Sequence, residues 1–140
     1  MAFAGISYAA ILGAGLAAWL FGAAYYMALS RPWMAAAGLS GMIDGAGAQR
    51  PRPVSLILSL VGELVMALVL AGSVSHLGPG QVTVKNAVIS ALILWAGFIV
   101  TTTTIAHSYQ RKPWMLTLID NGHWLGVMLI MGLVIGGFGV

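Results

Sequence analysis

The chain has 140 residues, of which 60% are hydrophobic and only 6% carry a formal charge. Soluble globular proteins carry charge on about 25% of their residues, and a chain this apolar has too little polar surface to face water. The composition therefore argues against a water-soluble enzyme and against a disordered chain. A net charge of +3 is too sparse for a nucleic-acid-binding protein. The absence of cysteine removes disulfides, thiolate metal sites and cysteine nucleophiles.

Four apolar segments are each longer than 20 residues, which is enough to cross a hydrocarbon core of about 30 Å. They cover about 5–29, 54–77, 84–107 and 115–138. Backbone groups in lipid must bond within their own segment, so helices are predicted. No basic residue precedes the first segment, which indicates a permanent span rather than a cleaved signal peptide. The expected fold is all-α, an integral membrane four-helix bundle forming a single transmembrane domain over residues 1–140.

The linker from Ser30 to Pro53 is the only long connection between the spans. Pro32 suits the first turn of a helix, so a short interfacial helix is expected between the first and second spans. Trp33 and Trp114 are predicted interfacial anchors, because amphipathic rings prefer the membrane boundary. The other side chains expected to rest on the membrane surface are Met34, Leu39, Met42 and Ile43.

Five of the six basic residues lie in two connections, the first and the third. They are Arg31, Arg50, Arg52, Arg111 and Lys112. With four spans these connections lie on one side of the membrane, and only Lys85 lies on the other. The positive-inside rule then predicts that both connections face the cytoplasm and that both termini are extracytoplasmic.

Polar side chains gather in the half of the spans nearest the basic connections. From the helical rise, Glu63 lies about 13 Å deep, Asp120 about 8 Å and His123 about 12 Å. An ionised carboxylate at a helix centre costs about 2.5–3.5 kcal/mol on insertion scales. Glu63 is therefore expected to face protein and either to pair, with His123 best matched in depth, or to stay protonated. The predicted intramembrane polar cluster comprises Glu63, Asp120, Asn121, His123, Thr101, Thr102, Thr103, Thr104, Tyr25 and Tyr26.

This cluster admits two interpretations. The functional one is a proton or solute site built from Glu63, Asp120 and His123, since ionisable groups inside membranes are functional by default. The structural one is a buried network that fixes helix register, whose contacts contribute about 0.6 kcal/mol each on average. Threonine hydroxyls can also bond their own helix backbone and do nothing further.

The sequence predicts no metal and no cofactor. Asp120 and His123 share a helix face, but a di-iron bundle needs two such motifs and further carboxylates. His76, His107 and His123 lie at unmatched depths for paired haem ligation. Because no recognisable nucleophile or nucleotide-binding motif is present, the chain is not expected to be an enzyme, and no catalytic residue is assigned.

Glycine accounts for 19 of the 140 residues. Two pairs in the fourth span, Gly122 with Gly126 and Gly132 with Gly136, have the spacing that lets helix backbones approach closely. Such faces serve packing within one chain or between chains. We therefore expect a homo-oligomer, or docking on a larger membrane complex.

Several stretches carry a family resemblance. They are Tyr25-Tyr26, Pro32-Trp33-Met34, Gly38-Leu39-Ser40, Trp95-Ala96-Gly97-Phe98, the run Thr101 to Thr104, Arg111-Lys112-Pro113-Trp114, Leu118 to His123, and Met131-Gly132. The chain resembles the DUF1761 family, small bacterial proteins with four predicted spans, over most of its length. Asn121, Gly122 and His123 fit a motif that family members commonly show in the last helix. The resemblance implies the four-span architecture in a bacterial inner membrane and implies no chemistry.

The leading functional prediction is a non-enzymatic structural or accessory membrane subunit that self-associates or docks on a larger complex. Its expected partners are membrane lipid and other subunits, with no nucleic acid. The alternative is a small proton-linked transporter or channel that uses Glu63, Asp120 and His123.

Overall fold

A computed structural model describes residues 6–39 and 51–139. Its elements, in chain order, are α1 (Tyr8–Ala28), α2 (Ser30–Ala37), α3 (Pro53–Ser75), α4 (Val84–Leu94), the π-helical segment η2 (Trp95–Val100), α5 (Thr101–Tyr109) and α6 (Trp114–Phe138). Since α4, η2 and α5 form one rod, four helices are long and apolar enough to cross a membrane. Their bounds agree with the predicted spans to within three residues, which confirms the all-helical fold.

Local sequence sets where the helices begin. The Ser7 hydroxyl accepts a hydrogen bond of 3.2 Å from the Ala10 N–H and so caps α1. Thr83 caps α4 in the same way through the Asn86 N–H. Pro53 opens α3, where its missing N–H would have no partner in any case. These helix starts therefore depend on residues next to them in the chain, which is why the sequence located them well.

The short helix between the first two spans is present, but it starts earlier than Pro32. Only Leu29 separates α2 from α1, and Gly38, at φ 80°, ends α2 in the left-handed conformation. Met34 is 3% exposed, because α2 packs against α6. The expectation that Met34 rests on the membrane surface is therefore wrong. Met42 and Ile43 lie outside the described residues.

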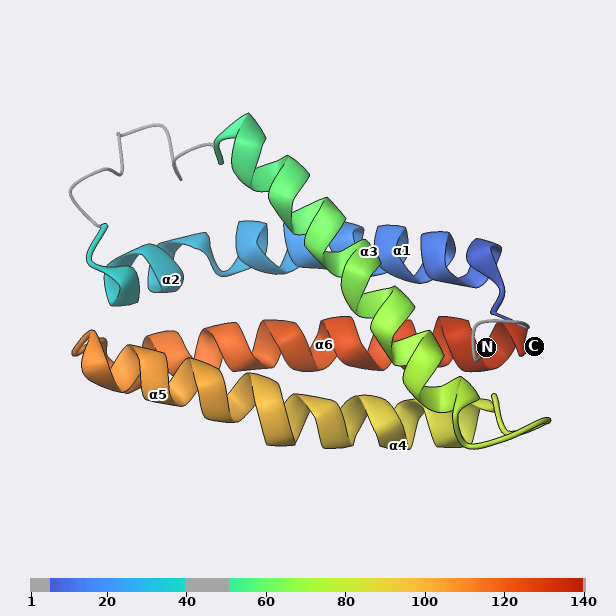
Figure 1. The fold of residues 1–140 in the computed structure, drawn as a ribbon. Coiled ribbons are helices and arrows are strands. Elements are labelled where there is room, and N and C mark those ends of the chain that lie inside the picture. Colours follow the sequence, from blue (N-terminus) through green and yellow to red (C-terminus); the bar gives the residue numbers. More distant parts are fainter. Residues whose placement is uncertain (1–5, 40–50, 140) are drawn as a thin grey trace.

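Three helical rods lie side by side, and the fourth crosses them (Figure 1). α6 packs against both α1 and α4 and runs in the opposite direction to each, whereas α3 passes obliquely over α1. The start of α1 and the end of α6 lie at one end of the molecule, here called the terminal end. The opposite end holds α2 and the turn between α5 and α6, with Arg31, Arg111 and Lys112. We call it the basic end.

The buried side chains divide between these two ends. Those toward the terminal end are all apolar among the described residues, and each is at most 7% exposed: Ala10, Ile11, Ala14, Ala18, Ala67, Leu70, Ala71, Val74, Ala87, Ala91, Val127, Met128, Met131 and Ile135. The buried polar residues lie in the other half of the helices: Glu63, Thr117, Asn121 and His123. The contiguous apolar core therefore lies toward the terminal end, whereas the basic half buries polar residues together with the apolar Met34, Leu116 and Ile119.

The predicted packing glycines of α6 are all used inside this chain. A Cβ at Gly132 would lie 3.1 Å from the Ala87 backbone oxygen of α4, and one at Gly136 would collide with the backbone of Val84. The other two predicted packing glycines of α6 face α1. The Phe21 side chain fills the space beside Gly126, and the Tyr25 side chain fills the space beside Gly122. Because α1 and α4 cover these faces, the glycine spacing no longer argues for contact between chains.

Candidate functional site

Asp120 of α6 is the centre of a polar group that ties four helices together. Its Oδ1 accepts hydrogen bonds from the Tyr26 hydroxyl at 2.7 Å and from the Trp33 indole N–H at 3.0 Å. Its Oδ2 lies 3.7 Å from Nε2 of His107 in α5. His107 Nδ1 is hydrogen-bonded to the Thr117 hydroxyl at 2.9 Å. The side chains of His107 and Asp120 keep 14% and 19% exposure, so this group reaches the surface.

Two more aromatic side chains hold the same stretch of α6 through its backbone. The Tyr25 hydroxyl donates to the Ile119 carbonyl oxygen at 2.8 Å, and the Trp95 indole N–H donates to that of Asn121 at 3.0 Å. Tyr25 belongs to α1 and Trp95 to η2. The α6 segment that carries Asp120 is therefore fixed from both sides.

Glu63 and His123 form a second, deeper group. They are 2% and 4% exposed, and they come from α3 and α6. A Cβ at Gly22 of α1 would lie 2.7 Å from His123 Nε2 and 3.8 Å from Glu63 Oε1. Both side chains therefore converge on one point of α1, where the absence of a side chain leaves room for the imidazole.

This second group has polar atoms without partners. Glu63 Oε2 and His123 Nδ1 are buried and make no hydrogen bond within residues 6–39 and 51–139. Leaving a buried polar group unpaired costs about 1–3 kcal/mol. These two atoms therefore add to the cost of folding unless a proton or a further partner satisfies them.

Aromatic rings surround the His123 imidazole. Its ring centre lies 4.7 Å from that of Tyr26 and 4.6 Å from that of Trp124, and Phe21 and Tyr25 stand slightly farther away. These rings restrict water on their sides of the imidazole. Tyr26 contacts His123 with its ring and Asp120 with its hydroxyl, so it connects the deep group with the surface group.

The Glu63 carboxyl and the His123 imidazole approach the same point of α1 without forming a hydrogen bond or an ion pair with each other among the described residues. Each group can by itself hold and release a proton. Within the part of the chain that the structure describes, no three His, Cys, Asp or Glu side chains come together in a way that would hold a metal ion.

The structure brings some of the predicted cluster together and separates the rest. Glu63, His123, Tyr25, Tyr26 and Asp120 gather as two linked groups rather than one. Asn121 is 8% exposed, and its side-chain oxygen has no partner among the described residues.

The threonine run stays apart from both groups. Thr101 and Thr102 face outward, and their hydroxyls donate to carbonyl oxygens of η2, including Gly97 at 2.7 Å from Thr101. A π segment shifts the backbone hydrogen bonds by one residue, and these hydroxyls satisfy carbonyls there. Thr103 and Thr104 are half-buried, and within the described chain neither makes a side-chain hydrogen bond to another helix.

Sequence reasoning missed several contributors, among them Thr117 and Trp95. Trp33, predicted as an anchor, donates to Asp120, whereas Trp114 is 71% exposed at the start of α6. His107 was considered only as a haem ligand, although it lies at the same end of the spans as Asp120. Gly22 continues the four-residue spacing of the small residues at 10, 14 and 18 in α1, and this signal could have identified it.

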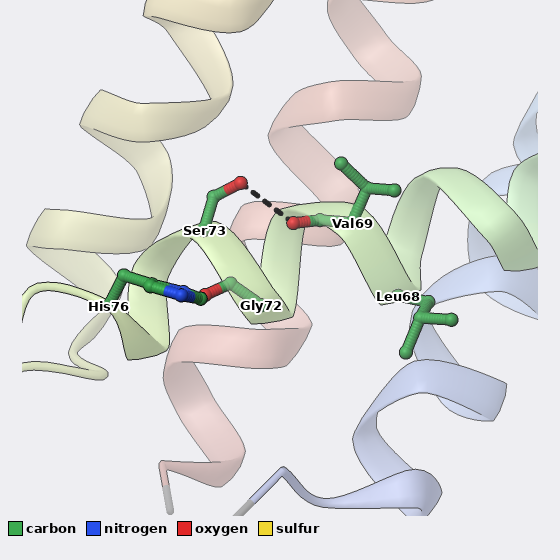
Figure 2. A pocket seen from close by; sticks show the side chains of 5 residues that line it. All are labelled: Leu68, Val69, Gly72, Ser73 and His76. Carbon is green, nitrogen blue, oxygen red and sulfur yellow. Dashed lines mark hydrogen bonds between the residues drawn. The ribbon is translucent and has the colours of Figure 1, made fainter. Parts of the chain in front are cut away.

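An open pocket lies elsewhere, on the outer surface of α3 near the terminal end (Figure 2). It is lined by Leu68, Val69, Gly72, Ser73 and His76. The Ser73 hydroxyl donates to the Val69 carbonyl at 2.8 Å, and His76 Nδ1 lies 2.7 Å from the Gly72 carbonyl. The Ser73 hydroxyl and His76 Nδ1 already bond α3, and the lining comes from α3 and the residue that follows it, so the buried groups are the stronger candidate site.

Comparison with known proteins gives a family and no activity. A family model described as "Protein of unknown function (DUF1761)" matches residues 9–136. No curated protein and no solved structure matches the chain.

Proposed function

We propose that this chain, which belongs to the DUF1761 family of unknown function, is a proton-conducting membrane transporter or channel. Its proposed proton site consists of Glu63 and His123. The observation that supports this is the burial of Glu63 Oε2 and His123 Nδ1 without partners. Apolar residues of similar shape would be less costly at these positions if packing were their only role. The proposed function is non-enzymatic.

The proposed orientation places the basic end in the cytoplasm of a bacterial cell, with the protein in the inner membrane and both chain ends outside. Arg31, Arg111 and Lys112 at one end of the molecule support this, because basic residues accumulate on cytoplasmic loops. A tag at the C-terminus that resists protease added to spheroplasts, whose outer membrane has been opened, would contradict it.

Proton flux into lipid vesicles tests the function. The whole chain is reconstituted with a pH-sensitive dye inside the vesicles, and a pH gradient is applied with the membrane potential clamped. We expect faster dye response than in protein-free vesicles, and a return to that background in Glu63→Gln. Asp44→Asn makes the same chemical change in the linker and should behave like the parent. Flux that is unchanged in Glu63→Gln, or absent from the parent, would contradict the proposal.

A self-associating or accessory subunit is the second candidate. One observation favours it: at Gly62, on the exposed side of α3, nothing lies within 4 Å of the position of a Cβ. A second helix can approach closely at such a site. Native mass spectrometry in mild detergent should then show a multimer that Gly62→Leu weakens. A strict monomer would argue against this candidate.

A further inference from the structure

We infer that the turn between α5 and α6 binds the phosphate headgroup of an anionic phospholipid, and that the Arg111 guanidinium is the group that holds the phosphate. The turn lies at the basic end and uses neither Glu63 nor His123, so the inference does not depend on the proposed function. Basic residues at one end set the orientation of a membrane protein. That rule does not explain why an arginine occupies this particular position of the turn.

Arg111 has a backbone conformation that favours glycine. Its φ is 53°, and it is the only residue other than glycine with a positive φ in the described chain. The Arg111 N–H donates to the Ser108 carbonyl oxygen at 3.1 Å, and the Lys112 N–H donates to that of His107 at 2.9 Å. This pair of hydrogen bonds closes a helix around one left-handed residue, which is usually glycine.

The end of α2 has the same turn with a glycine in it. There the Gly38 N–H donates to the Ala35 carbonyl oxygen at 3.2 Å, and the Leu39 N–H donates to that of Met34 at 2.8 Å. A residue with a Cβ is strained in the left-handed conformation. Since the backbone gains nothing from an arginine at this position, the value of the residue lies in its side chain.

The Arg111 side chain has no task within the described chain. It is exposed and makes neither a hydrogen bond nor an ion pair with another described residue. Of the two described acids, Glu63 is buried, and the Asp120 carboxylate already has partners in α1, α2 and α5. The guanidinium is therefore available to a group from outside the chain.

Lys112 places a second positive charge next to it in the turn. Its Nζ donates to the Ala37 carbonyl oxygen at 3.2 Å, which uses one of its three N–H donors and ties it to the end of α2. A guanidinium can bind two phosphate oxygens at once, and an ammonium adds a point charge. Two cations without an available acid fit a headgroup of net negative charge better than a zwitterionic one.

The surfaces on either side of the turn suit a lipid rather than a soluble phosphate. Tyr109 ends α5 and Trp114 begins α6, and both rings are largely exposed. Ile105 and Leu118 lie four residues farther into each span, on the same helix face as the ring of that helix, and they are exposed too. Such rings lie at headgroup depth, so a phosphate bound at the turn has apolar surface nearby for its acyl chains.

Lipid binding to the whole chain tests the inference. The protein is freed of lipid in a neutral detergent and titrated with phosphatidylglycerol or phosphatidylcholine, and native mass spectrometry counts the bound lipids. We expect phosphatidylglycerol to bind several-fold more tightly than phosphatidylcholine, and Arg111→Gln to lower its affinity several-fold. Lys85→Gln, which removes a charge at the terminal end, should bind like the parent.

Arg111→Gly separates binding from folding. Because glycine adopts a positive φ without strain, this variant should melt at a higher temperature than the parent when both are free of lipid. Phosphatidylglycerol should then raise the melting temperature of the parent by more than that of the variant. Glycerol phosphate at the same concentration, which has the phosphate but no acyl chains, should leave both melting temperatures unchanged.

Several results would overturn the inference. One is Arg111→Gly that binds phosphatidylglycerol as tightly as the parent, and another is equal binding of the two lipids by the parent. A lower melting temperature for lipid-free Arg111→Gly would show that the arginine side chain serves the fold itself. An equal rise with glycerol phosphate would identify the ligand as a soluble phosphate instead of a lipid.

Discussion

Gly22 of α1 and His123 of α6 are fitted to each other. A Cβ at position 22 would lie 2.7 Å from His123 Nε2, closer than nonbonded atoms approach. The imidazole is 4% exposed and has aromatic rings on several sides, so it has little room to move away. This contact between α1 and α6 therefore fixes where the imidazole stands relative to Glu63.

Adding one methyl group at this contact should destabilise the protein. Gly22→Ala is expected to cost about 1–3 kcal/mol, as overpacking in a filled core does, and to lower proton flux because His123 shifts. Gly13→Ala is the matched control on the same helix, where a Cβ would lie at an ordinary 3.7 Å from the Val134 side chain. Thermal unfolding in detergent measures both variants. Equal stability in the two would show that His123 moves aside freely.

The close approach of α4 and α6 predicts a second contrast between neighbouring glycines. A Cβ at Gly136 would collide with the Val84 backbone, whereas one at Gly137 meets nothing within 4 Å. Gly136→Ala should therefore destabilise by about 1–3 kcal/mol. Gly137→Ala should be neutral or slightly stabilising, because alanine is the better helix former. If the two variants unfold alike, α4 and α6 are not packed this closely.

Replacing Glu63 with leucine should make the protein more stable and abolish its proton flux. Glu63→Leu removes a buried polar group without a partner, so its free energy of unfolding should rise by about 1–3 kcal/mol. The same variant should lose proton flux completely. Unfolding and vesicle assays on one preparation measure both effects. A clear loss of stability would mean that Glu63 has a structural partner and that the functional interpretation is wrong.

The hydrogen bond from Trp33 to Asp120 should hold α2 in place. Trp33→Phe removes the indole donor at 3.0 Å, and a hydrogen bond to a charged group contributes about 1.5–3 kcal/mol. Backbone amides of α2 should then exchange faster with deuterium by mass spectrometry. Trp114→Phe, at a side chain that is 71% exposed, should leave that exchange unchanged. Unchanged exchange in Trp33→Phe would indicate that other contacts, such as Lys112 Nζ to the Ala37 carbonyl, suffice.

The sequence predicted the four spans, the short helix and the shared end of the two basic connections. These depend on apolar length, on capping residues and on charge in the loops, all of which are local in the chain. It also predicted that Glu63, Asp120 and His123 lie in the same half of the spans, since depth follows from counting residues along a helix.

Only the tertiary structure decided which of these groups meet. It divided the carboxylates between a surface group and a deep group, turned Thr101 and Thr102 outward, and covered the glycine faces of α6 with α1 and α4. The rotation of each helix about its axis and the oblique crossing of α3 arise from packing between surfaces far apart in sequence. The sequence of one helix does not determine its rotation or its crossing angle, because both depend on how the surfaces of two helices pack together.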